Sequence, residues 1–161
     1  MANDVYYQLR KQLDQYSVGF PSTESGVEIK ILEKLFTEEE AKMYLNLSMM
    51  LETPESVAER LKQDPEEVAL LLEQMAEKGL LFRLRKEGST SFGVVPYVVG
   101  IYEFQLKSMD QELAELHEEY FEETFAHHTS MKIVPMRTIP VNKSLDVSWP
   151  VAPYEDVREI I

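Results

Sequence analysis

Three side chains with metal-binding chemistry recur at helical spacing near the end of an acidic stretch. Glu119, Glu123 and His127 lie at positions i, i+4 and i+8, with His128 adjacent, and His117 lies off their face. Residues four apart share one side of a helix, so two carboxylates and an imidazole would point the same way. One helix rarely supplies a whole metal site, and no second cluster of His or Asp accompanies this one. We therefore expect a solvated helix face and no metal.

Nucleophilic and phosphate-cradling chemistry has no support in the sequence. The chain has no cysteine, which excludes disulfides, thiolate nucleophiles and Cys-ligated zinc or iron–sulfur clusters within these residues. Its six glycines are scattered rather than gathered in a phosphate-binding loop. Ser, Thr and the three His show no nucleophile–base pattern. The sequence predicts that this chain is no enzyme and has no catalytic or cofactor-binding residue.

Three basic residues, Arg83, Arg85 and Lys86, could contact phosphate. They fall at the end of an alternating segment, Leu80 to Arg85, and a second alternating segment runs from Thr90 to Val95. Two such segments around a Gly-containing turn predict a β-hairpin. On a winged helix this hairpin is the wing, and its cations could contact one or two phosphates. An ordinary solvated hairpin is the alternative, and it is the one that we favour.

The alternation also predicts which face of the hairpin is buried. Phe82 and Leu84 are expected to face inward, with Phe92 and Val94 opposite them. The two arginines between them are then expected to point to water.

Start signals for three helices precede the hairpin. They are a capping box from Thr37 to Glu40, proline at the first helical position in Thr53-Pro54, and the same arrangement in Asp64-Pro65. The helices that they predict run to about residues 51, 62 and 78, and Gly79 is a left-handed stop for the third. The last two helices have the spacing of a helix-turn-helix. Together with the hairpin they predict a winged helix over residues 37–99.

The helix over residues 65–78 occupies the place of a DNA-reading helix, and it is acidic. It carries four glutamates and one lysine. Proteins draw most of their non-specific DNA affinity from Lys and Arg, so a helix of this charge would be repelled by the groove that it is shaped to enter. The sequence therefore predicts that residues 65–78 do not bind DNA.

Helical periodicity also flanks the winged helix. Helices are predicted at residues 4–16 and 24–36 and, with eight acidic residues against Lys107 alone, at about 100–128. The apolar stripe of this long acidic helix is a candidate interface: Phe104, Met109, Leu113, Leu116 and Tyr120. Packing inside the monomer and dimerisation are equally good readings of the stripe. The prolines after Thr129 favour an extended tail.

Composition narrows the class of partner. The formal net charge of −13 disfavours nucleic acid and anionic membrane surfaces as partners of the whole molecule. No apolar run approaches eighteen residues, and the N-terminus lacks a basic start followed by an apolar stretch. A cytoplasmic location without a membrane span is the expectation.

Several short motifs of the sequence, taken together, resemble those of a protein family. They are Gly19-Phe20-Pro21-x-Thr23-x-Ser25-Gly26-Val27-Glu28, Leu35-Phe36-Thr37-x-Glu39-Glu40-Ala41, Met75-Ala76-x-Lys78-Gly79-Leu80, Val95-Pro96-Tyr97-Val98-Val99-Gly100-Ile101-Tyr102-Glu103-Phe104-Gln105 and Pro153-Tyr154-Glu155-Asp156-Val157. The chain resembles, over nearly its whole length, the N-terminal region of anaerobe proteins that carry 4Fe-4S ferredoxin-type domains. The resemblance implies that a cysteine-rich cluster domain follows the last motif, so this chain is expected to be a fragment of an iron–sulfur protein. No position here matches a cluster ligand.

The combined expectation is a mainly α, α+β protein built on a winged helix-turn-helix. It has an N-terminal helical extension (1–36), the winged-helix core (37–99), a long acidic helix (100–128) and an extended tail (129–161). Its expected function is that of a non-catalytic protein-interaction or dimerisation module at the front of a 4Fe-4S redox protein. The alternative is a winged-helix transcriptional regulator that contacts DNA through its wing.

Overall fold

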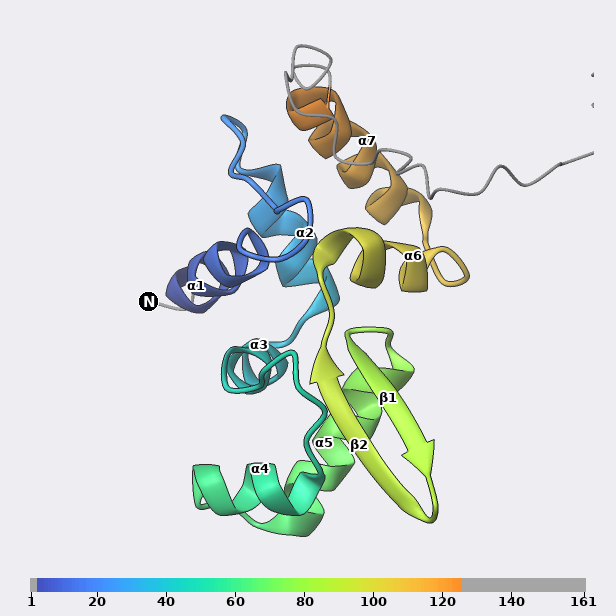
Figure 1. The fold of residues 1–161 in the computed structure, drawn as a ribbon. Helices are drawn as coiled ribbons and strands as arrows, with labels where there is room; N and C mark the ends of the chain where they lie inside the picture. Colours follow the sequence, from blue (N-terminus) through green and yellow to red (C-terminus); the bar gives the residue numbers. More distant parts are fainter. Residues whose placement is uncertain (1–2, 126–161) are drawn as a thin grey trace, which may run out of the picture. The chain divides into compact units, whose positions relative to one another are not determined.

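The computed structural model describes residues 3–125 and has the expected winged-helix architecture, mostly helical with one antiparallel hairpin (Figure 1). Its elements in chain order are α1 (Asn3–Leu13), α2 (Val27–Leu35), α3 (Glu38–Leu45), α4 (Pro54–Leu61), α5 (Pro65–Glu77), β1 (Leu81–Lys86), β2 (Ser89–Val94), η1 (Tyr97–Ile101), α6 (Tyr102–Gln105) and α7 (Gln111–Phe125). The predicted fold class is confirmed. The expected extended tail (129–161) lies outside the described residues.

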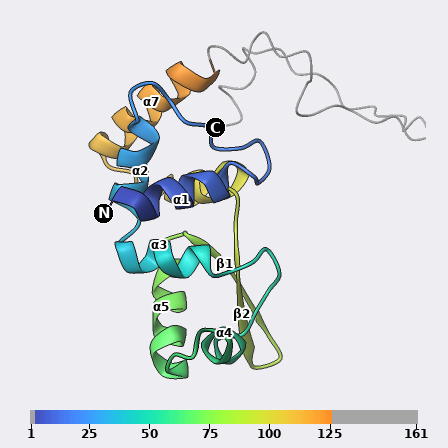
Figure 2. The same cartoon turned by 90° about the vertical axis from the view of Figure 1, so that its left-hand side faces the viewer.

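The helices pack in pairs around one hydrophobic core. α1 packs on α2 and α3, α2 on α7, and α4 on α5, which also covers the hairpin (Figure 2). The winged helix is thus α3, α4, α5 and the two strands. The N-terminal extension forms a second helical group with α7 and shares one core with the winged helix.

α3 begins as the sequence predicts and ends earlier. Both halves of the capping box are present, since the Glu40 amide donates to Thr37 Oγ1 (3.2 Å) and the Thr37 amide donates to Glu40 Oε2 (2.8 Å). The helix stops at Leu45 rather than at residue 51. The chain beyond it bends and then reaches β2, where Glu52 and Phe92 exchange two backbone hydrogen bonds (2.9 and 2.8 Å). The sheet ladder satisfies backbone groups that a longer helix would have bonded internally.

The helix-turn-helix of α4 and α5 is fixed by its caps. Thr53 accepts a hydrogen bond from the amide of Ser56 at the start of α4. After α5, Gly79 has the expected left-handed φ of +76°. A Cβ at this position would lie 2.6 Å from Phe104 Cβ, so glycine also permits the close approach of α6.

The hairpin closes through a two-residue turn, Glu87 and Gly88, whose φ angles are 51° and 81°. Positive φ at both central residues matches the type I′ turn, whose twist suits a hairpin. The register pairs Leu81 with Val94 and Lys86 with Ser89.

The prediction of one continuous helix over residues 100–128 is wrong. η1 has non-helical dihedrals inside, α6 ends at Gln105, and the acidic helix α7 begins only at Gln111. Asp110 ends the break, because its carboxylate accepts a hydrogen bond from the Leu113 amide (2.8 Å). This bond, with Lys34 beside it, lowers the pKa of Asp110. The cap at Asp110 therefore starts a new helix, although the spacing of apolar residues continues across the break.

The N-terminal helices are shorter than predicted. α1 stops at Leu13 rather than at residue 16, and α2 starts at Val27, because Gly26 before it has a left-handed φ of 69°. In the described part of the chain, no helix has the length and apolar character that crossing a membrane requires.

Candidate functional site

The exposed side of α5, the helix in the DNA-reading position, is anionic. Its buried stripe is Val68, Leu72 and Met75. The exposed positions of the helix are Pro65, Glu66, Glu67, Leu70, Gln74 and Glu77. They include three carboxylates and no cation, so the structure places the acidic residues of this helix where a phosphate backbone would approach.

The N-terminus of α5 is occupied by its own cap. Asp64 Oδ1 accepts hydrogen bonds from the amides of Glu66 (2.9 Å) and Glu67 (3.1 Å). A helix N-terminus can bind a phosphate through these amides, but here a carboxylate of the same chain already holds them.

The prediction that both wing arginines point to water is wrong for Arg83, whose side chain is 30% exposed, whereas the Arg85 side chain is 64% exposed. Arg83 Nη1 and Arg85 Nη2 both contact Glu73 Oε1 of α5, the second at 2.6 Å. They lie on the inner face of the hairpin, where the Cα partner of Arg83 is the buried Phe92. Leu81 provides the apolar anchor of that face.

The prediction that Phe82 and Leu84 face inward is also wrong, because the opposite face of β1 packs against α5. They occupy the outer face and are 45% and 40% exposed. Both alternating frames of β1 contain apolar residues, so alternation could not decide between them. The frame that buries Leu81 also brings both arginines to Glu73, whereas a one-residue shift would turn every side chain over. Phe92 and Val94 are buried as predicted.

Lys86, the third predicted wing contact, is exposed near the tip, 3.8 Å from Glu87 Oε1. Each of the three predicted basic residues therefore has a carboxylate beside it. The missed residue is Glu73. The sequence signal that could have revealed it was Glu73, next to the buried stripe of its helix, followed by two arginines at alternate positions of the next strand.

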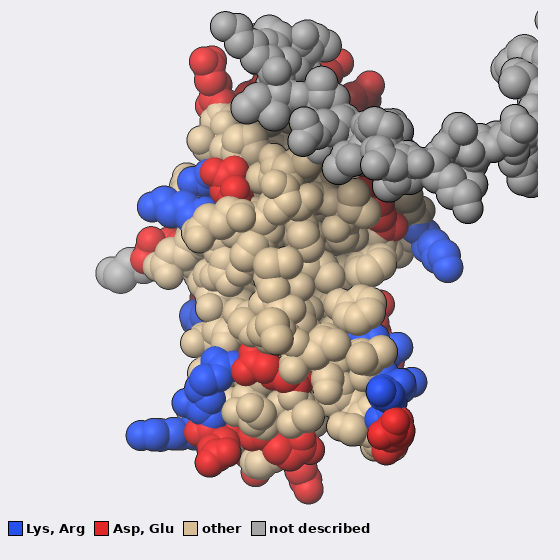
Figure 3. All heavy atoms as spheres, viewed as in Figure 1, with Lys and Arg blue, Asp and Glu red and all other residues tan. Residues whose placement is uncertain are grey.

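The outer face of the hairpin is apolar and continues onto the segment beside it. Met49, Met50 and Leu51 are exposed, Met50 at 75%, and a Cβ on Gly93 would lie 3.4 Å from the Leu51 side chain. We call Met49, Met50, Leu51, Phe82 and Leu84 the outer wing face. Viewed as in Figure 1, with β2 in front of α5, the middle of the surface is largely uncharged, with an acidic patch below it and other charged side chains at the margins (Figure 3).

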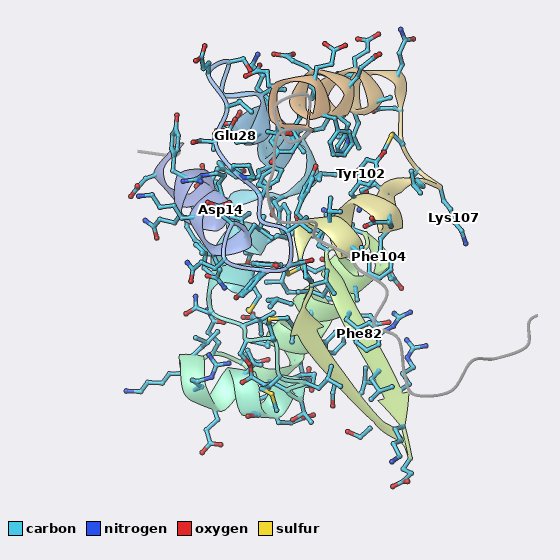
Figure 4. All side chains as sticks on the ribbon, turned by 45° about the horizontal axis from the view of Figure 1, so that its top comes forward. Asp14, Glu28, Phe82, Tyr102, Phe104 and Lys107 are labelled. Atoms are coloured by element: carbon cyan, nitrogen blue, oxygen red, sulfur yellow. The ribbon has the colours of Figure 1, made fainter. Side chains whose placement is uncertain are left out.

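A groove of about 780 Å³ adjoins β1. Phe82 from β1 and Phe104 from α6 both line it, together with Lys78 and Lys107 (Figure 4). Lys78 Nζ pairs with the buried Glu40 at 2.7 Å. Within the described residues no carboxylate pairs with Lys107, whose side chain projects outward in Figure 4. The groove thus combines aromatic surface with an available cation.

The predicted interface stripe is divided between core and surface. Leu113 and Tyr120 are buried, Met109 and Leu116 are half-buried against the core, and Phe104 is 47% exposed. α7 packs on α2 and uses its apolar side within the monomer. The stripe does not lie on one helix, since Phe104 belongs to α6.

The buried side of α7 contains a polar pair that the sequence did not reveal. His117 and Tyr97 are 2% and 1% exposed, and Tyr97 Oη lies 2.5 Å from His117 Nε2. His117 Nδ1 lies 2.7 Å from the carbonyl oxygen of Leu113, which can only accept. The imidazole therefore carries its proton on Nδ1 and accepts the Tyr97 hydroxyl proton at Nε2.

Burial sets the protonation of this pair. It lowers the pKa of His117 and raises that of Tyr97, so both are neutral near pH 7. Aromatic rings surround them and form what we call the aromatic cluster: Phe20, Tyr97, Tyr102, His117, Tyr120 and Phe121. The pair holds α7 to η1 and offers no exposed acid or base.

Of the side chains considered as metal ligands, the structure describes Glu119 and Glu123, both on α7. Glu123 accepts hydrogen bonds from the amides of Glu24 (3.1 Å) and Ser25 (3.4 Å). Hydrogen bonding to Ser25 lowers the pKa of Glu123. No group of three metal-ligating side chains occurs in the described part of the chain. His127 and His128 lie outside it.

Comparison with protein-family models and with curated proteins found no match. Among solved structures, a mutant of MepR from Staphylococcus aureus is similar at 13% identity and a TM-score of 0.36, covering 78% of this chain and 93% of that chain. A MarR transcriptional regulator from Methanosarcina mazei Go1 is 14% identical with a TM-score of 0.32, over 81% of this chain and 78% of that chain. MepR, described as a transcription regulator of the S. aureus multidrug efflux pump MepA, is 14% identical with a TM-score of 0.28, over 78% and 90%. At such values no property of these proteins is carried over.

Proposed function

We propose that this chain is a non-catalytic protein-interaction module built on a winged helix that does not bind DNA through α5. The observation that carries the proposal is the arrangement of charge. Glu66, Glu67 and Glu77 face outward from α5, while Glu73 holds both wing arginines. The surface that a winged helix presents to DNA is therefore anionic on the helix, and Glu73 offsets one of the two arginine charges on the wing.

The size of the repulsion supports this choice. Two like charges 4 Å apart cost about 1 kcal/mol in bulk water and more near a protein surface. DNA carries a charge for every ~1.7 Å of its axis, so three carboxylates in the groove would each face several phosphates.

A protein partner suits the outer wing face better. Its five members are large apolar side chains, each at least 40% exposed. Contiguous exposed apolar surface is a feature of protein-binding sites, because burying it against a partner removes it from water.

The test is electrophoretic mobility of random duplex DNA at low salt. The wild-type protein is expected to leave the duplex unshifted. The variant E66K/E67K/E77K, which keeps the buried stripe of α5, is expected to shift it, and the shift should weaken steeply as salt rises. Clear salt-sensitive binding by the wild-type protein would overturn the proposal.

DNA binding by a transcriptional regulator is the second candidate function. The helix-turn-helix of α4 and α5 and the basic residues of β1 favour it. On this reading Arg83 and Arg85 leave Glu73 and contact phosphates. R83E/R85E should then abolish binding to an operator, and unchanged binding would reject contact through the wing.

We further propose that the chain is the N-terminal part of a 4Fe-4S iron–sulfur protein, with the sequence resemblance as its support. A cluster needs thiolate ligands, and this sequence has no cysteine, so its ligands would lie elsewhere in the parent. The test is the genomic sequence that follows the codon for Ile161. Clustered cysteines there are expected, and an open reading frame without them would overturn this proposal.

A further inference from the structure

One edge of β1 presents backbone groups that the described residues leave unpaired. On β2, Phe92 exchanges hydrogen bonds with Glu52, and the Val94 amide donates to the Ser48 carbonyl (3.1 Å), so both residues direct their backbone polar groups away from β1. In an antiparallel ladder, bonded and non-bonded pairs alternate. The pairs that join the two strands are therefore Phe82 with Gly93, Leu84 with Ser91, and Lys86 with Ser89.

The other residues of β1 direct their backbone N–H and C=O groups away from β2, within the plane of the sheet. Arg83 and Arg85 direct their amides and carbonyls to the far edge, where no backbone partner occurs among the described residues. Such an edge is a template for another strand. The groove adjoins the start of this edge, since Leu81, Phe82 and Arg83 line it with Phe104 and Lys107.

The side chains of β1 differ sharply between its two faces. Its inner face carries Arg83 and Arg85, and its outer face carries Phe82 and Leu84. With Lys86, the strand has three cations and no acid, in a chain whose net charge is −13. A strand added at this edge would alternate in the same way, with one set of side chains beside the arginines and the other beside the two apolar residues.

We propose that the free edge of β1 at Arg83 and Arg85 binds an extended segment of a partner protein, in which acidic and apolar residues alternate, as an added β-strand. The proposal rests on the protein-interaction function and names the chemistry of its partner. Apolar residues of the segment pack beside Phe82 and Leu84, and its carboxylates lie beside the arginines. A segment reaching past the start of β1 meets Phe104 and Lys107.

A second copy of this chain fits the edge poorly. Pairing β1 with β1 would set Arg83, Arg85 and Lys86 against the same three cations. Like charges on adjacent strands destabilise the pairing. Charge complementarity thus selects an acidic strand over self-association.

The test uses a capped octapeptide that alternates valine with glutamate, titrated into the ¹⁵N-labelled protein. Binding is expected to shift the amide resonances of Arg83 and Arg85 and to slow their hydrogen exchange at least tenfold. The controls are a peptide of the same composition with the valines and glutamates in separate blocks and a peptide with lysine in place of glutamate. Neither control should bind measurably at the same concentration.

A matched pair of variants tests whether the edge backbone is used. R85Q and R85P remove the same charge, but only R85P removes the edge amide, which does not belong to the ladder with β2. R85P is expected to bind the alternating peptide about tenfold more weakly than R85Q. Thermal melts report whether both variants are folded, and the exchange measurement on the wild-type protein stands without them.

Three results would overturn the proposal: no binding of the alternating peptide to the wild-type protein, equal binding of either control peptide, or equal affinity of folded R85P and R85Q. Failure of the proposed function has a different signature, which is salt-sensitive binding of duplex DNA by the wild-type protein. A negative peptide titration with no DNA shift removes the edge proposal alone.

Discussion

The aromatic cluster and the wing each contain paired polar side chains, but one pair contributes to stability and the other to the surface charge. Tyr97 and His117 are buried, and the Tyr97 hydroxyl donates its hydrogen bond to the imidazole. Glu73 and the two arginines lie partly exposed, with side-chain exposures from 30% to 64%. A buried pair is costly to break, whereas an exposed one contributes little to stability. The first pairing fixes the fold, and the second sets the charge that a partner meets.

The largest expected effect comes from breaking the buried pair. H117A removes both hydrogen bonds of the imidazole, leaves the Tyr97 hydroxyl without its acceptor and opens a cavity. We expect the free energy of unfolding to fall by about 3 kcal/mol, measured by urea denaturation. E118A, at the exposed neighbouring position of α7, should change it by less than about 0.5 kcal/mol. Equal effects of the two variants would contradict the role given to the pair.

Acid should weaken the aromatic cluster through His117. Burial lowers the pKa of His117, so the folded state stays neutral at pH values where the unfolded state binds a proton, near pH 6.5 and below. His117 therefore contributes its full stability above about pH 6.5, and this contribution falls as pH decreases, by up to about 1.4 kcal/mol per pH unit. The measurement is the unfolding free energy of wild type minus that of H117Q between pH 7.5 and 5. A difference that does not shrink on acidification would show that the folded imidazole titrates normally.

In the wing, an exposed substitution should alter binding more than stability. E73Q releases both arginines, and we expect the free energy of unfolding to change by less than about 1 kcal/mol. The mobility of duplex DNA at low salt should respond more, because two cations become available to phosphates. E77Q removes one carboxylate from the same helix without releasing an arginine. An equal mobility shift of duplex DNA with E73Q and with E77Q would show that Glu73 does not restrain the arginines.

The smallest expected effect on stability is at the outer wing face. F82S changes a residue that is 45% exposed, so the free energy of unfolding should fall by less than about 0.5 kcal/mol. The neighbouring L81A removes a side chain that is 2% exposed and should cost about 3 kcal/mol. Thermal melts of the two variants compare the two faces of β1 directly. A large loss in F82S would mean that this face is covered in the folded protein.

The sequence determined most of the fold through local signals. The capping box at Thr37, proline at Pro54 and Pro65, the left-handed stop at Gly79 and the two alternating strands each act within a few residues. Such signals depend on backbone hydrogen bonds and dihedral preferences that neighbours in sequence decide. The winged helix and the acidity of α5 could therefore be predicted without the structure.

Tertiary structure alone decided which side chains meet. Alternation in β1 permits two faces, and only packing against α5 selects the one that buries Leu81, joins Arg83 and Arg85 to Glu73 and exposes Phe82 and Leu84. In the same way, the pairing of Tyr97 with His117 spans a break that helical periodicity could not reveal. Contacts between residues distant in sequence are chosen by the burial of the whole core, so no local pattern encodes them.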